Sequence, residues 1–115
     1  MLKAGATLLL SLITHTARAA QIVAVRVWPA ADYTRVTLEN DSDLKVTHFV
    51  VKDPERLVVD IEGIELNNVL KSLGDKVGPN DPYIRQLRAA NYKPGVVRLV
   101  FDLKQAISPQ VFTLP

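Results

Sequence analysis

The side chains best suited to acid–base chemistry in this 115-residue chain are two neighbouring carboxylates and His48, the one histidine that follows residue 19. Asp60 and Glu62 alternate with apolar residues, so on a strand they would share one face, as a pair of catalytic carboxylates requires. The same spacing is typical of charged residues on the solvent side of a sheet, and we adopt that interpretation. A zinc hydrolase needs about three protein ligands around an open position, which His48 alone cannot provide. We interpret His48 as a solvated or hydrogen-bonded strand residue.

Nucleophilic catalysis is also not indicated. The serines Ser42, Ser72 and Ser108 lie in expected turns or at the tail of an expected helix, and none stands in a G-x-S-x-G context. The chain contains no cysteine. We therefore predict a non-enzymatic segment with no catalytic residue, no metal ligand and no cofactor.

The first 19 residues have the layout of a secretory signal peptide. Lys3 precedes an apolar stretch at 4–13, and Ala17-Arg18-Ala19 supplies an A-x-A cleavage site. A stretch of this length is too short to span a membrane as a helix, which needs roughly 20 residues. We expect cleavage after Ala19, export to the periplasm, and a mature domain at 20–115 without a membrane span.

Charge argues against a nucleic-acid partner. Loss of Lys3 and Arg18 reduces the 14 basic residues to the number of acidic ones, 12, so the mature chain is neutral. The balance is uneven, because residues 20–65 hold five basic and nine acidic side chains while 66–115 hold seven and three. Arginines suit bidentate contact with carboxylates, so the second half is a candidate binding region. An ordinary solvated face is the alternative.

Hydrophobic spacing predicts a mainly β fold. Alternating or β-branched runs bounded by turn residues predict strands at 22–28, 33–39, 44–51, 56–62, 84–90, 96–103 and 107–114. Between the fourth and fifth, Leu66, Val69, Leu70 and Leu73 recur at helical spacing, and Gly74 is placed to end a short helix.

An internal repeat links the two halves. At an offset of 63 residues, the segment 98–102 (RLVFD) falls on 35–39 (RVTLE), and at 62 residues Leu87-Arg88 falls on Val25-Arg26. We predict two symmetry-related antiparallel sheets of about four strands each. The counterpart of 57–61 would lie near 120–124, so we expect the last strand to be missing and the chain to be a fragment of a longer protein. Chance similarity between alternating strands is the alternative.

Several segments resemble the AMIN domain. They are 24–30 (AVRVWPA), 33–37 (YTRVT), 53–61 (DPERLVVDI), 81–84 (DPYI) and 97–105 (VRLVFDLKQ). The similarity is greatest to the N-terminal domain of periplasmic N-acetylmuramoyl-L-alanine amidases of the AmiC type, and it covers essentially all of 21–115.

The resemblance implies a fold, a ligand and a location. The fold is a pair of similar four-stranded sheets, in agreement with the repeat. The implied role is peptidoglycan binding that brings an amidase to the septal ring for daughter-cell separation, with divisome proteins as further partners. Zinc is expected only in the catalytic domain, which is absent here. The signal peptide lacks the paired arginines of twin-arginine export. The alternative parent is a type IV pilus secretin, which also carries this module.

The candidate peptidoglycan-binding residues are one tyrosine and five arginines: Tyr33, Arg35, Arg56, Arg85, Arg88 and Arg98. For Arg56 the alternative is a structural ion pair across the sheet with an acid such as Asp60. Aromatic residues at expected strand ends or turns suit sugar contact. Among these, we expect Trp28 to cap the core instead.

Overall fold

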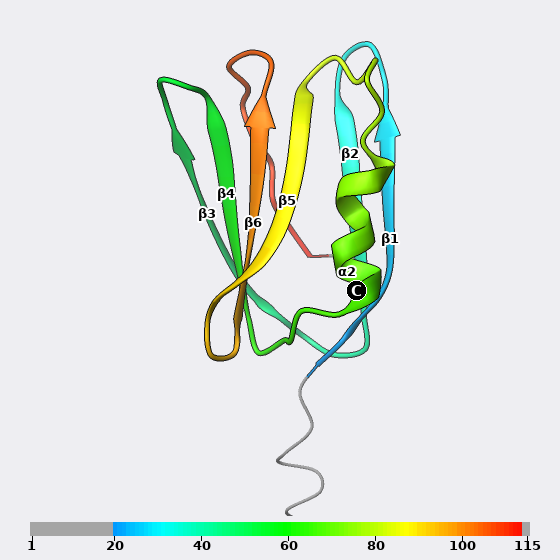
Figure 1. Cartoon of the computed structure of the whole chain (residues 1–115), viewed down its shortest axis with the longest axis vertical. Coiled ribbons are helices and arrows are strands. Elements are labelled where there is room, and N and C mark those ends of the chain that lie inside the picture. Colours follow the sequence, from blue (N-terminus) through cyan, green and yellow to red (C-terminus); the bar gives the residue numbers. More distant parts are fainter. Residues whose placement is uncertain (1–19, 114–115) are drawn as a thin grey trace, which may run out of the picture.

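A computed structural model describes residues 20–113, so the expected signal peptide lies outside the described residues. This part of the chain contains six strands and a short helical segment (Figure 1). In order, they are β1 (Ile22–Pro29), β2 (Thr34–Asn40), β3 (Lys45–Val51), β4 (Arg56–Glu62), helix α2 (Asn68–Lys71), the 3-10 helix η1 (Ser72–Lys76), β5 (Ile84–Lys93) and β6 (Val96–Leu103). The prediction of a mainly β fold with one short helix between the halves is confirmed.

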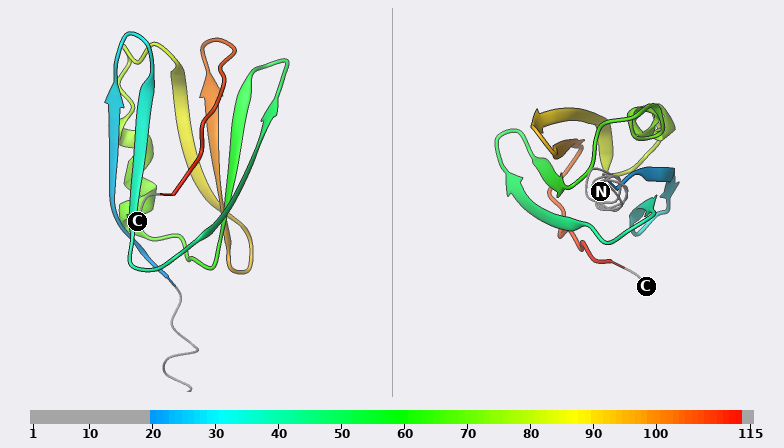
Figure 2. Two further views of the ribbon diagram at one scale, coloured as in Figure 1. Left: turned by 180° about the vertical axis from the view of Figure 1, so that it is seen from behind. Right: turned by 90° about the horizontal axis from the view of Figure 1, so that it is seen from below.

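Two antiparallel sheets face one another. The larger has the strand order β3-β4-β6-β5, and the smaller consists of β1 and β2 (Figure 2). The larger sheet therefore takes two strands from each half of the chain, because β4 pairs along its whole length with β6. The chain crosses from one sheet to the other between β2 and β3. This exchange brings residues far apart in the sequence onto one sheet.

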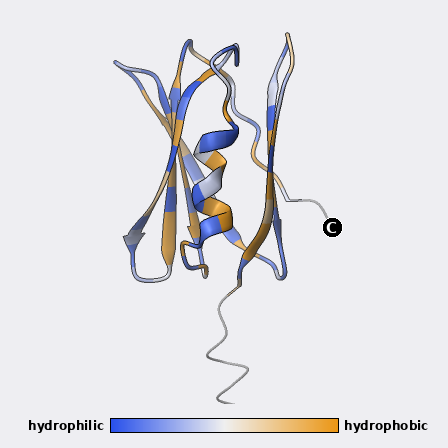
Figure 3. Ribbon diagram, turned by 45° about the vertical axis from the view of Figure 1, so that its right-hand side comes forward, coloured by the Kyte–Doolittle hydropathy of each residue, from blue (hydrophilic) through white to orange (hydrophobic). Residues whose placement is uncertain are grey.

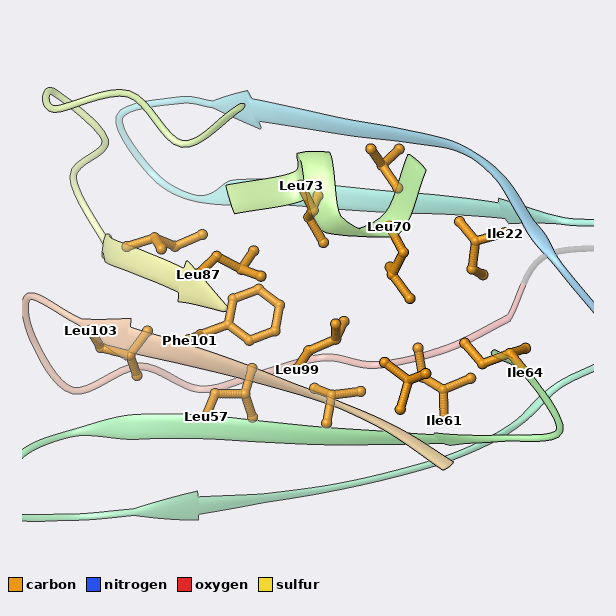
Figure 4. Packing of buried hydrophobic residues seen from close by; sticks show 14 residues of the cluster. Ile22, Leu57, Ile61, Ile64, Leu70, Leu73, Leu87, Leu99, Phe101 and Leu103 are labelled. Atoms are coloured by element: carbon orange, nitrogen blue, oxygen red, sulfur yellow. The ribbon is translucent and has the colours of Figure 1, made fainter. Parts of the chain in front are cut away.

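The hydrophobic core lies between the sheets. Alternate residues of β4 and β6 point inward, and they meet apolar side chains from β1, β5 and the helical segment (Figure 4). The buried members include Leu57, Ile61, Leu99 and Phe101, together with Leu70 and Leu73, which are fully buried. Burial of this many large apolar side chains is the dominant stabilising contribution.

The helical segment closes the gap between the sheets on one side (Figure 3). Asn67 caps α2, since its side chain accepts a hydrogen bond from the Leu70 amide at 2.8 Å. Gly74 was expected to end the helix, but it lies inside η1. A Cβ at Gly74 would stand 2.7 Å from the carbonyl oxygen of Leu87, so glycine is required because η1 approaches the backbone of β5 closely.

The internal repeat is visible in the strand register. Trp28 pairs with Arg35 across the β1–β2 hairpin, and Ala90 pairs with Arg98 at the equivalent place in β5–β6. An ion pair is repeated as well. Arg26 lies 3.4 Å from Glu39, and the corresponding residues Arg88 and Asp102 lie 3.1 Å apart.

The strand expected at 107–114 is not formed in the described part of that segment, 107–113. Its counterpart in the first half, β3, is a strand because it pairs with β4. Among the described residues no strand pairs with 107–113, and a strand needs cross-strand hydrogen bonds. The sheets accordingly contain four and two strands, where about four were expected in each.

A buried carboxylate ties the two hairpins together. Asp81 is 2% exposed and accepts hydrogen bonds from the Tyr83 and Ile84 amides, both at 2.9 Å. It also accepts one from the Thr34 hydroxyl at 3.0 Å. Asp81 thus fixes the start of β5 against the start of β2, and its burial is compensated by these bonds.

Candidate functional site: the outer face of the four-stranded sheet

The face of the four-stranded sheet that points away from the core carries the features expected of a binding surface. Strand alternation places one side chain in two on this outer face. Its centre, which we call the central patch, combines aromatic, apolar and ion-paired side chains from all four strands: Phe49, Val58, Asp60, Tyr92, Arg98 and Val100.

An ion pair between the two inner strands organises the central patch. Asp60 on β4 stands opposite Arg98 on β6, and the guanidinium donates two hydrogen bonds to the carboxylate, from Nε at 2.8 Å and from Nη2 at 2.9 Å. The hydrogen bond from Arg98 lowers the pKa of Asp60, although partial burial opposes the shift. The same bond raises the pKa of Arg98. Both groups are therefore charged at neutral pH.

Two aromatic rings flank this arginine. The guanidinium carbon of Arg98 lies 3.6 Å from the centre of the Tyr92 ring and 5.7 Å from that of Phe49. These are distances at which a cation is attracted to an aromatic ring. Tyr92 is 52% exposed and Phe49 is exposed to a similar extent. The stacked groups form a platform whose planar side chains are open to solvent.

Beside the platform runs a short apolar row. Phe49, Val58 and Val100 stand opposite one another on β3, β4 and β6. Val58 belongs to the outer face yet is nearly buried, which shows that its neighbours pack closely over it. The central patch thus combines ring faces with branched aliphatic groups.

Further ion pairs compensate the charges around the patch. Arg88 lies 3.1 Å from Asp102, and Lys45 lies 3.6 Å from Glu62. The two halves of opposite net charge meet where β4 pairs with β6. The acidic half supplies Asp60 to an arginine of the basic half.

Comparison with protein-family models matches residues 24–115 to the AMIN domain. That range covers most of the chain. The chain belongs to the AMIN domain family. The resemblance recognised in the sequence is therefore confirmed.

Two similar proteins carry amidase names. N-acetylmuramoyl-L-alanine amidase AmiC of Escherichia coli O6:H1 (strain CFT073) is 48% identical over 112 residues, which is 96% of this chain and 27% of that protein. The protein of the same name from Neisseria meningitidis serogroup B (strain MC58) is 50% identical over 105 residues, 91% of this chain and 25% of that protein. The chain spans about a quarter of the length of these relatives.

The AMIN fold divides the six candidate residues between two sheets. Arg88 and Arg98 lie on the outer face, and the exposed Arg85 is at the start of β5 beside a register shift. Arg56 is the first residue of β4, and its side chain donates to the carbonyl of Pro54 at 3.5 Å. The alternative of an Arg56–Asp60 ion pair is wrong, because Arg98 occupies that carboxylate.

The other two candidates lie on the β1–β2 hairpin of the AMIN domain. Tyr33 is in the turn before β2, and Arg35 is on β2 with its guanidinium carbon 5.7 Å from the Trp28 ring centre. Trp28 is half exposed, so the expectation that it caps the core is wrong. Tyr33 and Arg35 therefore do not join the central patch.

The candidate residues predicted from the sequence do not include the acid and the two aromatic residues that complete the central patch, which are Asp60, Phe49 and Tyr92. Asp60 is predicted from the sequence to be an ordinary exposed charge. Their juxtaposition depends on β4 pairing with β6, which lies 38 residues further along the chain. A search for acids and arginines at matching positions of alternating strands would have indicated the Asp60–Arg98 pair.

Within residues 20–113, no three His, Asp, Glu or Cys side chains lie together in a way that could hold a metal ion. His48 is exposed and lines a small hollow with Leu44, Val46 and residues 111–113. No helix in this part of the chain is long and apolar enough to cross a membrane.

Proposed function

We propose that this AMIN domain is a non-catalytic module that binds peptidoglycan through the outer face of the four-stranded sheet. It holds a cell-wall N-acetylmuramoyl-L-alanine amidase against its substrate in the periplasm. The exposed platform of Tyr92, Arg98 and Phe49 carries the proposal. Zinc, in this proposal, belongs to the catalytic part of the parent protein.

The platform is suited to binding because it is preorganised. Asp60 holds the guanidinium of Arg98 in one orientation, and the guanidinium in turn stacks on the Tyr92 ring. Rigid aromatic groups lose little conformational entropy when a ligand covers them. Asp60 and Arg98 are on the inner strands β4 and β6, whose opposite sides form the core, and Tyr92 and Phe49 are on the edge strands β5 and β3. Binding therefore requires no refolding of the domain.

Multivalent binding to a repeating polymer supports a role as a targeting module. A flat, open surface makes few contacts with one sugar or peptide and is expected to bind weakly. Tethering to an enzyme and repetition of the ligand along a polymer raise the effective concentration, so weak contacts suffice to localise the enzyme. We propose that the amidase is directed in this way to the septal ring, where daughter cells separate. The amidase names of both relatives favour this parent over a pilus secretin.

Co-sedimentation with purified sacculi tests the proposal. The full-length protein is expected to pellet with sacculi, and Tyr92→Ala is expected to reduce the bound fraction several-fold. Tyr33→Ala is the matched control, because Tyr33 is 56% exposed but lies on the other sheet. This control is expected to bind like the wild type. Equal binding by both variants would exclude the outer face, and absence of pelleting by the wild type would exclude the function.

A further inference from the structure

If the domain binds peptidoglycan as proposed, its structure also indicates which part of the polymer it contacts. Peptidoglycan offers uncharged N-acetylated sugar rings and peptides rich in carboxylates. We propose that the outer face recognises the glycan chain and not the carboxylates of the stem peptides. This reverses the expectation that the arginines of the second half capture carboxylates.

The two arginines nearest the centre of the face, Arg88 and Arg98, already have carboxylate partners. Both the Nε and the Nη2 atoms of Arg98 donate to Asp60, so its preferred bidentate edge is occupied. Arg88 also donates to a carboxylate, that of Asp102, but through one nitrogen only, Nη2 at 3.1 Å. A stem-peptide carboxylate would have to displace a carboxylate that the fold holds in place. Such an exchange gains little, because one ion pair replaces another.

The central patch is electrically neutral for the same reason. The guanidinium of Arg98 is matched by Asp60 on the neighbouring strand, and the remaining members are Phe49, Tyr92, Val58 and Val100. Lys93 lies beside the patch, with its Nζ 5.9 Å from the Tyr92 ring centre. A neutral patch with ring faces complements a neutral ligand that has apolar C–H faces. The pyranose rings and acetyl methyl groups of the glycan have this character, whereas a stem-peptide carboxylate would lose hydration over a patch whose arginine is already paired.

The dimensions of the platform also suit adjacent sugars. The Tyr92 and Phe49 ring centres lie 3.6 and 5.7 Å from the same carbon of Arg98, so the two rings are near neighbours on the face. Consecutive pyranose rings of a linear glycan can stack on one ring each. The guanidinium between them retains donors that can bond acetamide oxygens.

Competition experiments distinguish the two parts of the polymer. The full-length protein is bound to sacculi at low temperature and challenged with glycan strands stripped of peptide, with oligomers of N-acetylglucosamine, or with the free stem tetrapeptide. The two glycan probes are expected to displace the wild type, and the tetrapeptide is not. The difference in sacculus binding between the wild type and Tyr92→Ala measures the contribution of the central patch. This difference is expected to change by less than about twofold when added salt shortens the Debye length from about 10 to about 3 Å.

Variants that free an arginine provide a positive test. Asp60→Asn leaves Arg98 without its carboxylate, so this variant is expected to gain tetrapeptide binding that high salt abolishes. Asp102→Asn does the same for Arg88 and serves if the first variant folds poorly. Displacement of the wild type by the tetrapeptide but not by glycans would overturn the inference while leaving peptidoglycan binding intact. Failure of the wild type to bind sacculi at all would instead remove the function on which the inference rests.

Discussion

Arg98 is the residue on which the character of the outer face depends. It combines a hydrogen-bonded ion pair with Asp60 and a stack on Tyr92. Partly exposed ion pairs usually contribute little to stability, but two parallel hydrogen bonds in a fixed geometry are the favourable case. The pair also sets the orientation of the platform, so its loss affects both stability and binding.

The Asp60–Arg98 pair predicts a pH-dependent stability. The pKa of Asp60 in the folded protein lies below its ordinary value of 3.8, because Arg98 donates hydrogen bonds to the carboxylate. The pair therefore stabilises the fold above that ordinary value, and this stabilisation is lost as the pH falls through the lowered pKa. Asp60→Asn should lower the thermal midpoint at neutral pH.

Thermal unfolding at neutral pH and at about pH 2 checks this prediction. The difference between wild type and Asp60→Asn is expected to shrink at the acidic pH, because the wild-type carboxylate is increasingly protonated as the pH approaches its lowered pKa. Glu62→Gln is the control, since Glu62 lies on the same strand face in an open contact with Lys45 at 3.6 Å. An equal loss of stability for Asp60→Asn at both pH values would contradict the assignment.

At single positions, the sequence predicted where a side chain lies better than which residue it contacts. It named Arg88 and Arg98 as candidate binding residues, and the structure has both on the outer face of the four-stranded sheet. It did not reveal that each has an acid beside it, because ion pairing depends on the order of strands in the sheet. The same limit applies to Asp81, whose bonds to Thr34 and to the start of β5 need the tertiary structure.

The secondary-structure elements follow the sequence closely where a strand has a partner. Alternation located β1 to β6, and helical spacing located the segment containing Leu70 and Leu73. The failure at 107–113 has a physical cause, since alternation alone does not supply a neighbouring strand. Gly74 was also misinterpreted from the sequence. It was expected to end the helix, but its lack of a side chain lets η1 pack closely on β5.

The contact between η1 and β5 makes a prediction about two glycines. Gly74→Ala would place a Cβ 2.7 Å from the Leu87 carbonyl oxygen, so either η1 or β5 must shift. We expect a loss of about 1–3 kcal/mol in the free energy of unfolding. Gly78→Ala is the matched control, because a Cβ there meets nothing within 4 Å.

Urea denaturation of both glycine variants measures these free energies. The Gly78→Ala midpoint is expected to stay close to that of the wild type, as is usual for surface substitutions. If Gly74→Ala were as stable as Gly78→Ala, the close approach of η1 to β5 would be incorrect.

The molecule as a whole combines a sequence repeat with an exchange of strands. Repeat units supply two similar hairpins, β1–β2 and β5–β6, but β3 and β4 of the first half complete the sheet of the second. The exchange places Asp60 of the acidic half beside Arg98 of the basic half, so an ion pair flanked by aromatic rings lies at the centre of the outer face. The repeat and the family can be predicted from the sequence. This ion pair cannot, because it requires knowing that β4 lies beside β6.

Hydroxyl-radical footprinting of the full-length protein, with and without fragmented sacculi, tests the central claim most directly. This measurement reports the solvent access of individual aromatic side chains by mass spectrometry. The account predicts that sacculi protect Tyr92 and Phe49 from oxidation and leave the similarly exposed Tyr33 unchanged. Protection of Tyr33 with no change at Tyr92 would contradict it.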